Sequence, residues 1–437
     1  MRAIRFRHPI SLFDTPEQGV CMHLSLFGRK FSSQSGVVDL MTDLGDALTE
    51  NPGIIFMGAG NPGRVKEVEA FFQQRLQEIA SNKVDSHALF GIYQEPQGDR
   101  EFRRKLADFL NKQCGWEVSE KNIAFSNGSQ SAFFVLHNLF AGKMPEGGRR
   151  RIHFPLAPEY IGYADTGLIE DFFSATQPSI KLLDNHLFKY CVDFSRLCPS
   201  DEIGALCVSR PTNPTGNVLT DEEISKLDKI ARDKEIPLIV DCAYGSPFPN
   251  IQFEKVTPHW NENTVLVLSL SKLGLPGVRT GIVVACEGII EAYTNANTVV
   301  SLACGNLGPA LTASLFETGK MSALTRNYVT PFYRDRSAQA VEWFHEALAG
   351  LPYRIHKPEG AIFLWLWFKD LPISSKELYE RLKRRGVLIV PGHNFFIGLE
   401  DDWSHTHECI RVSYAQKGDA VRRGIILIAE EVKGAYG

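Results

Sequence analysis

Short apolar runs alternate with helical patterns through the middle of the chain. The clearest unit starts with an apolar run at residues 203–209 and ends with a second run at residues 236–240. Between the runs, Thr220 and Glu223 have the spacing of a capping box, and apolar residues then recur every three or four positions. Strand, helix and strand in this order predict a parallel crossover, and therefore an α/β sheet.

Other apolar runs fit the same sheet, and the pattern changes after residue 330. The further runs are residues 122–125, 151–154, 264–270 and 281–285. The later part predicts helices at residues 333–348 and 375–385, strands at 361–368, 387–390 and 409–413, and a closing helix. We therefore expect a large α/β domain over residues 65–315, a small α+β domain over 316–437, and an N-terminal arm and small-domain segment over 22–64.

The first 21 residues differ from the rest of the chain. They have a basic start, two prolines and weak periodicity, whereas the pattern becomes regular from Met22 onward. We interpret residues 1–21 as an extension and expect translation to begin at Met22. The intact mass of the protein from its natural source tests this, because residues 2–21 would be missing from it.

Composition and charge narrow the classes of function. The chain has 437 residues with 47 basic and 51 acidic side chains, and its pI is near 6.3. This balance gives no global field that would attract nucleic acid or anionic lipid.

Nine cysteines lie scattered without a C-x-x-C pair, which disfavours a zinc site and a disulfide framework and favours a reduced cytoplasm. The longest apolar runs are too short to span a membrane, and the N-terminus lacks the apolar core of a signal peptide.

The stretch GAGNPG at residues 58–63 has the spacing G-x-G-x-x-G of a dinucleotide-binding loop. That fingerprint also needs a second strand ending in an acidic residue, and none is evident after the helical pattern that follows. Pro62 moreover lacks the N–H that such a loop donates to phosphate. We therefore do not expect a dinucleotide site here.

Polar residues stand at the ends of the apolar runs. They occupy residues 126–131, 158–160, 213–216, 241–244 and 269–272. Because ligands of open parallel sheets bind outside the carboxyl ends of the strands, we expect these residues to converge on one crevice.

The residues in this crevice suit one cofactor chemistry. Lys272, after an apolar strand, can be desolvated and made nucleophilic toward a carbonyl, and a buried Asp241 needs a cationic partner. Pyridoxal 5'-phosphate offers an aldehyde for the lysine and a pyridinium nitrogen for the aspartate. Asn213 and Tyr244 can donate to its phenolic oxygen, and Tyr160 can stack on its ring. Residues 127–130, just before an apolar helix, and Arg279 can bind its phosphate.

Three motifs in this order resemble those of fold type I pyridoxal-phosphate aminotransferases: SRPTNPTGNV, DCAYG and SLSKLGLPGVRTG. Longer stretches such as PLAPEYIGYAD, HKPEGAIFLWLWFKDLP and RLKRRGVLIVPGHNFF resemble the group of these enzymes that exchanges valine and pyruvate for 3-methyl-2-oxobutanoate and alanine. The resemblance covers nearly everything after Met22. It implies a large domain with a mostly parallel seven-stranded sheet flanked by helices, and a small α+β domain built from the C-terminal part and the N-terminal segment.

The resemblance also implies the role of each site residue. Lys272 would form the Schiff base with the cofactor and move the α-proton in a ping-pong reaction. Asp241 would pair with the pyridine nitrogen. The residues implied for the rest of the cofactor are Gly128, Ser129, Gln130, Ser269 and Arg279 for the phosphate, Asn213 and Tyr244 for the phenolate oxygen, and Tyr160 for the ring face.

Substrate and partner contacts follow from the same resemblance. Arg411 would bind the α-carboxylate, with Asn213, Gly60 and Asn61 facing the amino acid. Tyr93 would reach the phosphate of a second subunit, so a cytoplasmic homodimer with shared sites is implied. Small amino acids and 2-oxo acids are the expected partners, and nucleic acid and membranes are not. His405 and His407 have no third ligand at fixed spacing, so no metal is expected.

Three alternatives to the expected reaction stay open. The same fold could carry an aminotransferase of other substrate preference or a β-lyase, which would use the same residues around the cofactor. A non-enzymatic regulator with an aminotransferase-like domain would need a helix-turn-helix segment ahead of it, and the residues before Met22 are too few for one.

The apolar run at residues 362–367 suits either small branched substrates or simply a core strand.

Overall fold

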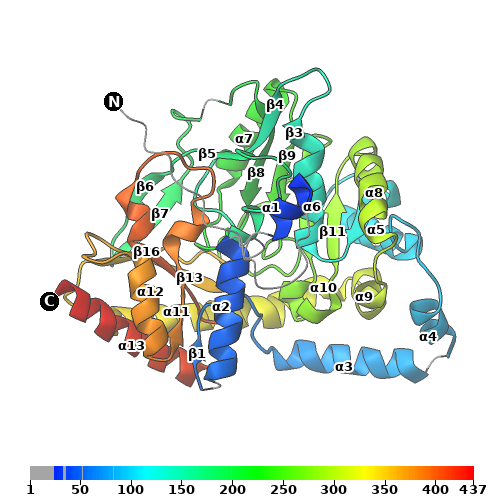
Figure 1. The fold of residues 1–437 in the computed structure, drawn as a ribbon. Coiled ribbons are helices and arrows are strands. Elements are labelled where there is room, and N and C mark those ends of the chain that lie inside the picture. The colour runs from blue at the N-terminus through cyan, green and yellow to red at the C-terminus, as the bar shows by residue number, and fades with distance from the viewer. Residues whose placement is uncertain (1–23, 33–35, 52, 82, 198) are drawn as a thin grey trace, which may run out of the picture.

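The protein is described from a computed structural model. The structure describes residues 24–32, 36–51, 53–81, 83–197 and 199–437. The extension at residues 1–21 and the expected start at Met22 lie outside these ranges. Two large sheets and one pair of short strands organise the chain, with helices packed around them (Figure 1).

The larger sheet has the strand order β2-β11-β10-β9-β8-β4-β3, with β5 also paired to β4. Neighbours among β5, β4, β8, β9 and β10 run parallel, whereas β11 runs antiparallel between β10 and β2. Seven strands thus make the mostly parallel sheet that the family resemblance implies, and the two-residue β3 adds an eighth. The strands are β2 (Ile123–Ser126), β3 (Gly142–Lys143), β4 (Arg149–Phe154), β5 (Phe173–Ala175), β8 (Ile203–Ser209), β9 (Leu238–Asp241), β10 (Thr264–Ser269) and β11 (Gly281–Val284).

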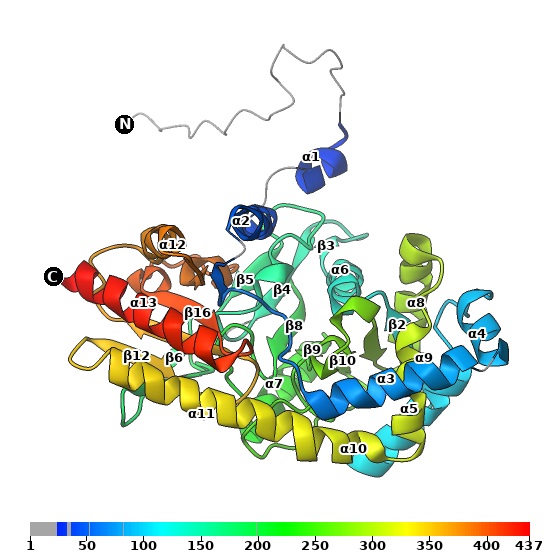
Figure 2. The ribbon, with the colours of Figure 1, turned by 90° about the horizontal axis from the view of Figure 1, so that it is seen from below.

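Helices cover both faces of this sheet. Helices α6 (Ser129–Phe140) and α8 (Glu287–Ser301) pack on one face, while α5 (Arg100–Cys114), α7 (Asp221–Asp233) and α9 (Leu307–Glu317) pack on the other. Figure 2 shows the strands between α6 and α5. All residues of β8 are buried, as expected for a continuous apolar run in a parallel sheet covered on both faces.

The predicted unit β8-α7-β9 is confirmed. Thr220 accepts a hydrogen bond from the Glu223 N–H, and the Glu223 side chain accepts one from the Thr220 N–H at 2.8 Å, so both ends of the capping box are made. The parallel register places Ser209 opposite Asp241. The polar ends of these strands therefore meet at one edge of the sheet.

The second sheet has the order β15-β16-β13-β12-β7-β6. Its strands are β6 (Ser179–Leu182), β7 (Leu187–Cys191), β12 (Tyr353–His356), β13 (Phe363–Phe368), β15 (Val390–Pro391) and β16 (Cys409–Ser413). The hairpin β6-β7 comes from the range predicted for the large domain but pairs with β12 in this sheet. The division at residues 64/65 and 315/316 stays a prediction.

The N-terminal segment lies against the C-terminal part of the chain. Strand β1 (Ile55–Phe56) pairs in parallel with β14 (Val387–Leu388). Helix α2 (Gly36–Glu50) is held against α12 (Ser375–Arg384) by Asp43, which accepts hydrogen bonds from Tyr379 and Lys383. Figure 1 shows α2, in blue, beside the orange α12.

The remaining helices complete the outer layer. They are α1 (Leu26–Ser32), α3 (Lys66–Ser81), α4 (Lys83–Phe90), α10 (Lys320–Leu324), α11 (Thr330–Ala347) and α13 (Gly418–Tyr436). Helix α4, and not a strand, follows α3, as expected for a chain without a dinucleotide fingerprint. Within the described ranges, no helix combines the length and the apolar character needed to cross a membrane.

Candidate active site

A cavity of about 410 Å³ lies at the polar strand ends of the larger sheet and is closed by residues of α2, β1, β15 and β16. The predicted site residues that line it are Gly60, Asn61, Ser129, Gln130, Tyr160, Asn213, Asp241, Tyr244, Ser269, Lys272, Arg279 and Arg411. The structure therefore brings together nearly the whole predicted set. Gly128 lies directly beside Arg279, and Tyr93 lies elsewhere.

Lys272 stands in a short turn directly after β10. Its Nζ donates a hydrogen bond to the Gly60 carbonyl oxygen at 2.6 Å and lies 5.3 Å from the centre of the Tyr244 ring. Burial and, to a smaller extent, the nearby charges of Arg411 and Arg279 lower the pKa of Lys272 to about 8, although Asp241 opposes them. A substantial neutral fraction near physiological pH makes this amine a nucleophile toward a carbonyl.

Asp241 ends β9 at the floor of the cavity. One carboxylate oxygen accepts a hydrogen bond from the Tyr163 hydroxyl at 2.6 Å, and the other accepts one from the Ala243 N–H at 2.8 Å. Burial raises the pKa of Asp241. Because both of these partners are neutral, a cationic ring nitrogen in the cavity would stabilise the buried charge.

Tyr163 is a site residue that the sequence reasoning missed. Its side chain is fully buried and packs against the rings of Phe133 and Phe154. The only local signal is its position three residues after Tyr160, whose ring stands edge-on to it at 5.2 Å. Gln130 donates to the Gly162 carbonyl oxygen at 2.6 Å and so fixes the loop that carries both tyrosines.

Arg411 is a buried cation facing the cavity. Its two terminal nitrogens donate to the Asn213 amide oxygen and to the Gly58 carbonyl oxygen, both at 2.7 Å. The guanidinium lies 4.1 Å from the Phe363 ring centre and 5.1 Å from that of Phe395. Burial lowers the pKa of Arg411 to about 10, which leaves it charged at neutral pH. Its Nε is buried without a hydrogen-bond partner among the described residues, so the group can still receive an anionic ligand.

The first turn of α6 and Arg279 form an anion site. Gly128 caps the helix with φ 94°, no side chain caps its N–H groups, and no acidic residue stands in its first turn. The Arg279 guanidinium covers Gly128 so closely that a Cβ there would lie 2.1 Å from Nη2. Free helical N–H groups beside a guanidinium suit a phosphate.

These residues fit pyridoxal 5'-phosphate. The cavity offers a nucleophilic lysine, a buried aspartate bonded only to neutral donors, a phosphate site and an aromatic face. Asn213 uses its amide oxygen on Arg411, which leaves its N–H₂ to donate to a ring oxygen. These features together match the aldehyde, the ring nitrogen, the ring face and the phosphate of this cofactor.

Tyr93 lies outside this cavity. Its side chain is 84% exposed, beside the exposed Phe90 and Ile92 at the end of α4. Its contact with the phosphate of a second subunit stays a prediction.

The apolar run at residues 362–367 belongs to the core. All but one residue of β13 are buried, and none lines the cavity. The larger aliphatic and phenyl side chains that do line the cavity are Met41, Leu44, Phe56 and Val390, together with Ile161 near Tyr160. Sequence reasoning missed the first four because they come from three separate elements.

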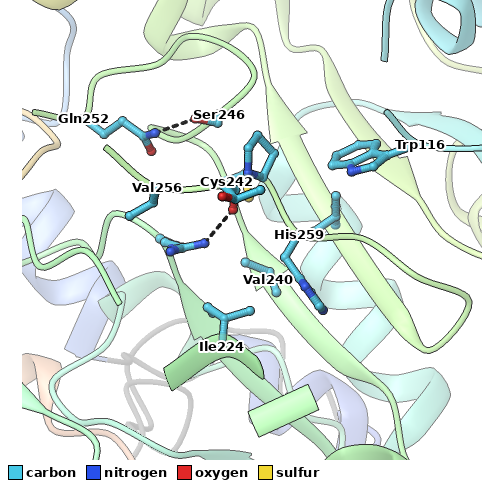
Figure 3. A pocket seen from close by; sticks show the side chains of 12 residues that line it. Trp116, Ile224, Val240, Cys242, Ser246, Gln252, Val256 and His259 are labelled. Carbon is cyan, nitrogen blue, oxygen red and sulfur yellow. Dashed lines mark hydrogen bonds between the residues drawn. The ribbon is translucent and has the colours of Figure 1, made fainter. Parts of the chain in front are cut away.

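A second, smaller cavity lies behind β9 (Figure 3). Val240 lines it and, by strand alternation, points away from the face that carries Asp241. Its volume of about 20 Å³ has room for roughly one water molecule. Arg210, which lines this cavity, is paired with Asp221 at 2.6 Å. Cys242 and His259 also line this cavity, which shares no lining residue with the active-site cavity.

Comparisons with known proteins agree with this geometry. The family described as Aminotransferase class I and II matches residues 186–425. The chain is 50% identical over 415 residues to valine–pyruvate aminotransferase of Escherichia coli K12, covering 95% of this chain and 99% of that protein. The crystal structure of valine-pyruvate aminotransferase from Salmonella typhimurium LT2 superposes with a TM-score of 0.85 at 46% identity, covering 92% of this chain and 99% of that one. A multiple substrate aminotransferase from Thermococcus profundus, 20% identical with a TM-score of 0.77 over 94% and 98% of the two chains, shares the fold.

Proposed function

Because this chain belongs to the class I and II aminotransferases, we propose that it transfers the amino group of valine to pyruvate, giving 3-methyl-2-oxobutanoate and alanine. Pyridoxal 5'-phosphate is the cofactor of this family. The observation that carries the proposal is the placement of Lys272 and Arg411 on one cavity, in a chain half identical to a valine–pyruvate aminotransferase.

The proposal gives each cofactor contact to a residue of the cavity. When bound, the cofactor supplies an aldehyde and an electron-withdrawing ring that acidifies the Cα–H of an amino acid. Asp241 keeps the ring nitrogen protonated, and Tyr160 packs on the ring. Asn213 and Tyr244 donate to the ring oxygen. The phosphate is held by Gly128, Ser129, Gln130, Ser269 and Arg279.

Substrate binding and proton transfer fall to four residues. Arg411 binds the α-carboxylate with the donors that the protein leaves free. Because its pKa is lowered, part of the Lys272 amine is neutral and can accept a proton. Lys272 takes the proton from Cα of the amino acid and delivers it to the cofactor. Asn61 and Gly60 line the same cavity and limit the space between Arg411 and Lys272. Since valine and pyruvate each carry a carboxylate beside the reacting carbon, both half-reactions use the same arginine.

The proposal includes a homodimer in which Tyr93 reaches the partner's phosphate. Large apolar side chains are exposed at the end of α4 and at the end of α8, where Val299 is 89% and Leu302 61% exposed. The loop after α8 touches the phosphate end of the site, because the Gly305 N–H donates to Asn127 at 3.3 Å. A second subunit on this surface would therefore lie next to the phosphate.

A cytoplasmic location is also part of the proposal. The cysteines within the described ranges are all unpaired, as expected for a protein kept in a reducing compartment. Isolation of the protein with its thiols alkylated in intact cells, followed by mass spectrometry, tests this. Disulfide-linked cysteines would contradict it.

A donor panel with pyruvate tests the reaction. Purified holoenzyme should form alanine from pyruvate with valine, and with 2-aminobutanoate as a second donor. A β-lyase would release ammonia and a 2-oxo acid without needing any oxo acid acceptor. Alanine formation that depends on pyruvate supports the aminotransferase, and acceptor-independent ammonia release contradicts it.

A further inference from the structure

Four of the apolar side chains that line the active-site cavity come from elements outside the larger sheet. They are Met41 and Leu44 of α2, Phe56 of β1 and Val390 of β15. Their neighbours Gly58 and Ala59 add no polar side chain. We call these four side chains the apolar wall.

The apolar wall starts next to the proposed carboxylate site. Val390 stands opposite Arg411 in the register of β15 and β16. The residues after β1 link the wall to both reactive groups, because the Gly58 carbonyl accepts from Arg411 and the Gly60 carbonyl accepts from Lys272. Phe56, Gly58 and Gly60 are alternate residues of one stretch. An amino acid that spans the arginine and the lysine would therefore have the wall within reach of its side chain.

Two members of the wall are held firmly. Leu44 is 3% and Val390 1% exposed, and both belong to the main hydrophobic core. The contacts of Asp43 with Lys383 and Tyr379 fix α2, the helix that carries Leu44, against α12. Because these side chains are packed in the core, they cannot move aside freely to make room for a longer substrate side chain. Met41, at 62% exposure, lies at the solvent side of the wall.

No member of the apolar wall is charged, and the charged side chains of the cavity have other proposed roles. The side chains that line it and can carry full charge near neutral pH are Asp241, Lys272, Arg279 and Arg411. Arg411 and Lys272 act on the reacting end of the substrate, and Asp241 and Arg279 on the cofactor. A carboxylate in the substrate side chain would meet the wall without a cation from the described part of this subunit, and burying it there would be costly.

We infer that Leu44, Phe56 and Val390 select the donor side chain, admitting short aliphatic groups and excluding longer or acidic ones. The inference rests on the proposed function and adds to it the residues that set its substrate class. A single methylene in a hydrophobic pocket changes kcat/KM by roughly 10- to 200-fold, so small changes in the wall should shift the ranking of donors.

Two opposite substitutions at one position test the inference. Val390→Ala opens the wall and should raise the ratio of kcat/KM for leucine over valine by about 10-fold or more. Val390→Ile narrows the cavity at the wall and should lower the ratio of kcat/KM for valine over alanine by about the same factor. Leu44→Ala should act like Val390→Ala. If an emptied core lowers the expression of the alanine variants, Val390→Ile still tests the wall.

Leu48→Ala is the matched control. Leu48 lies one helical turn after Leu44 in α2 and packs on the same core, but it does not line the cavity. Its substitution should lower the thermal stability without changing any donor ratio. Glutamate and aspartate should be poor donors for the wild-type enzyme in the same panel.

The outcomes separate the inference from the proposed function. A wild-type enzyme that makes no alanine from valine overturns the proposed function. In another outcome, the wild-type enzyme is active while the Val390 variants and Leu44→Ala all keep the wild-type donor ratios within about twofold. That result overturns only the role of the wall in donor selection, because the expected effect is about 10-fold. Rapid use of glutamate or aspartate by the wild-type enzyme also overturns it.

Discussion

Tyr163 donates its hydroxyl hydrogen bond to Asp241 over 2.6 Å, and both side chains are buried beneath the active-site cavity. The second carboxylate oxygen is bound by the Ala243 N–H. The orientation of the carboxylate is therefore fixed by the protein before any cofactor arrives. Tyr163 acts as a positioning residue, since it touches Asp241 and is not among the residues that line the cavity.

Tyr163→Phe should weaken cofactor binding without unfolding the protein. The variant loses the donor that orients the Asp241 carboxylate and keeps it charged, so the pairing of this carboxylate with the ring nitrogen should weaken by about 1.5–3 kcal/mol, or roughly 10- to 100-fold in the dissociation constant of pyridoxal 5'-phosphate. Titration of apoprotein with the cofactor measures it. Tyr353→Phe is the control, because it removes a tyrosine hydroxyl bonded to His345 at 2.7 Å in the other sheet. Equal affinities for Tyr163→Phe and wild type would contradict the positioning role.

The pKa of Lys272 predicts how cofactor attachment depends on pH. Only the neutral amine attacks an aldehyde, and burial lowers its pKa to about 8. The rate of covalent attachment to apoprotein should therefore rise with pH and level off above about pH 8, where the amine is mostly deprotonated. Stopped-flow absorbance across this range measures it. A rate that still rises nearly tenfold per pH unit near pH 9 would show a lysine of ordinary pKa.

Arg411→Gln should impair both substrates of the exchange together. The variant removes the buried cation that we propose for the α-carboxylate, which should lower kcat/KM by about 100-fold or more. The loss should be similar for valine and alanine because they share the carboxylate. Arg354→Gln, which removes hydrogen bonds to the Leu183 and Leu187 carbonyl oxygens in the second sheet, is the control. A loss confined to one of the two amino acids would assign Arg411 to side-chain recognition instead.

Mixed dimers test whether Tyr93 serves the neighbouring subunit. Tyr93→Ala alone should weaken both sites of a homodimer, and Lys272→Ala alone should remove activity. In a dimer of one subunit of each kind, the site with an intact Lys272 would receive the intact Tyr93 of the other subunit. Co-expressed and separately tagged subunits should therefore recover one wild-type site per mixed dimer. Activity no higher than that of the Tyr93→Ala protein would place Tyr93 in its own subunit.

The sequence predicted the parts of the fold that local patterns determine. The unit β8-α7-β9 follows from two apolar runs and a capping box. Most of the cofactor-site residues follow from polar side chains at strand ends, whereas Arg411, Gly60 and Asn61 follow only from the family resemblance. The hairpin β6-β7 was missed because its place depends on pairing with β12, more than 150 residues away. The antiparallel direction of β11 likewise depends on its neighbours, since an apolar run carries no direction.

The missing site residues share the same cause. Tyr163 carries no motif, and its role appears only where its loop meets the end of β9. The pattern of α2 shows which of its faces is apolar, but not that Leu44 closes a cavity with Val390. Conversely, the run at residues 362–367 is apolar enough for a substrate wall and proves to be a core strand. Periodicity predicts burial, whereas only the fold decides what a buried side chain contacts.

Transfer of labelled nitrogen tests the central claim most directly. Holoenzyme given ¹⁵N-valine and unlabelled pyruvate should produce ¹⁵N-alanine and 3-methyl-2-oxobutanoate in equal amounts, and Lys272→Ala should produce neither at a comparable rate. Mass spectrometry of the products follows both. Label recovered in ammonia, or full transfer by the Lys272→Ala protein, would contradict a valine–pyruvate exchange that depends on this lysine.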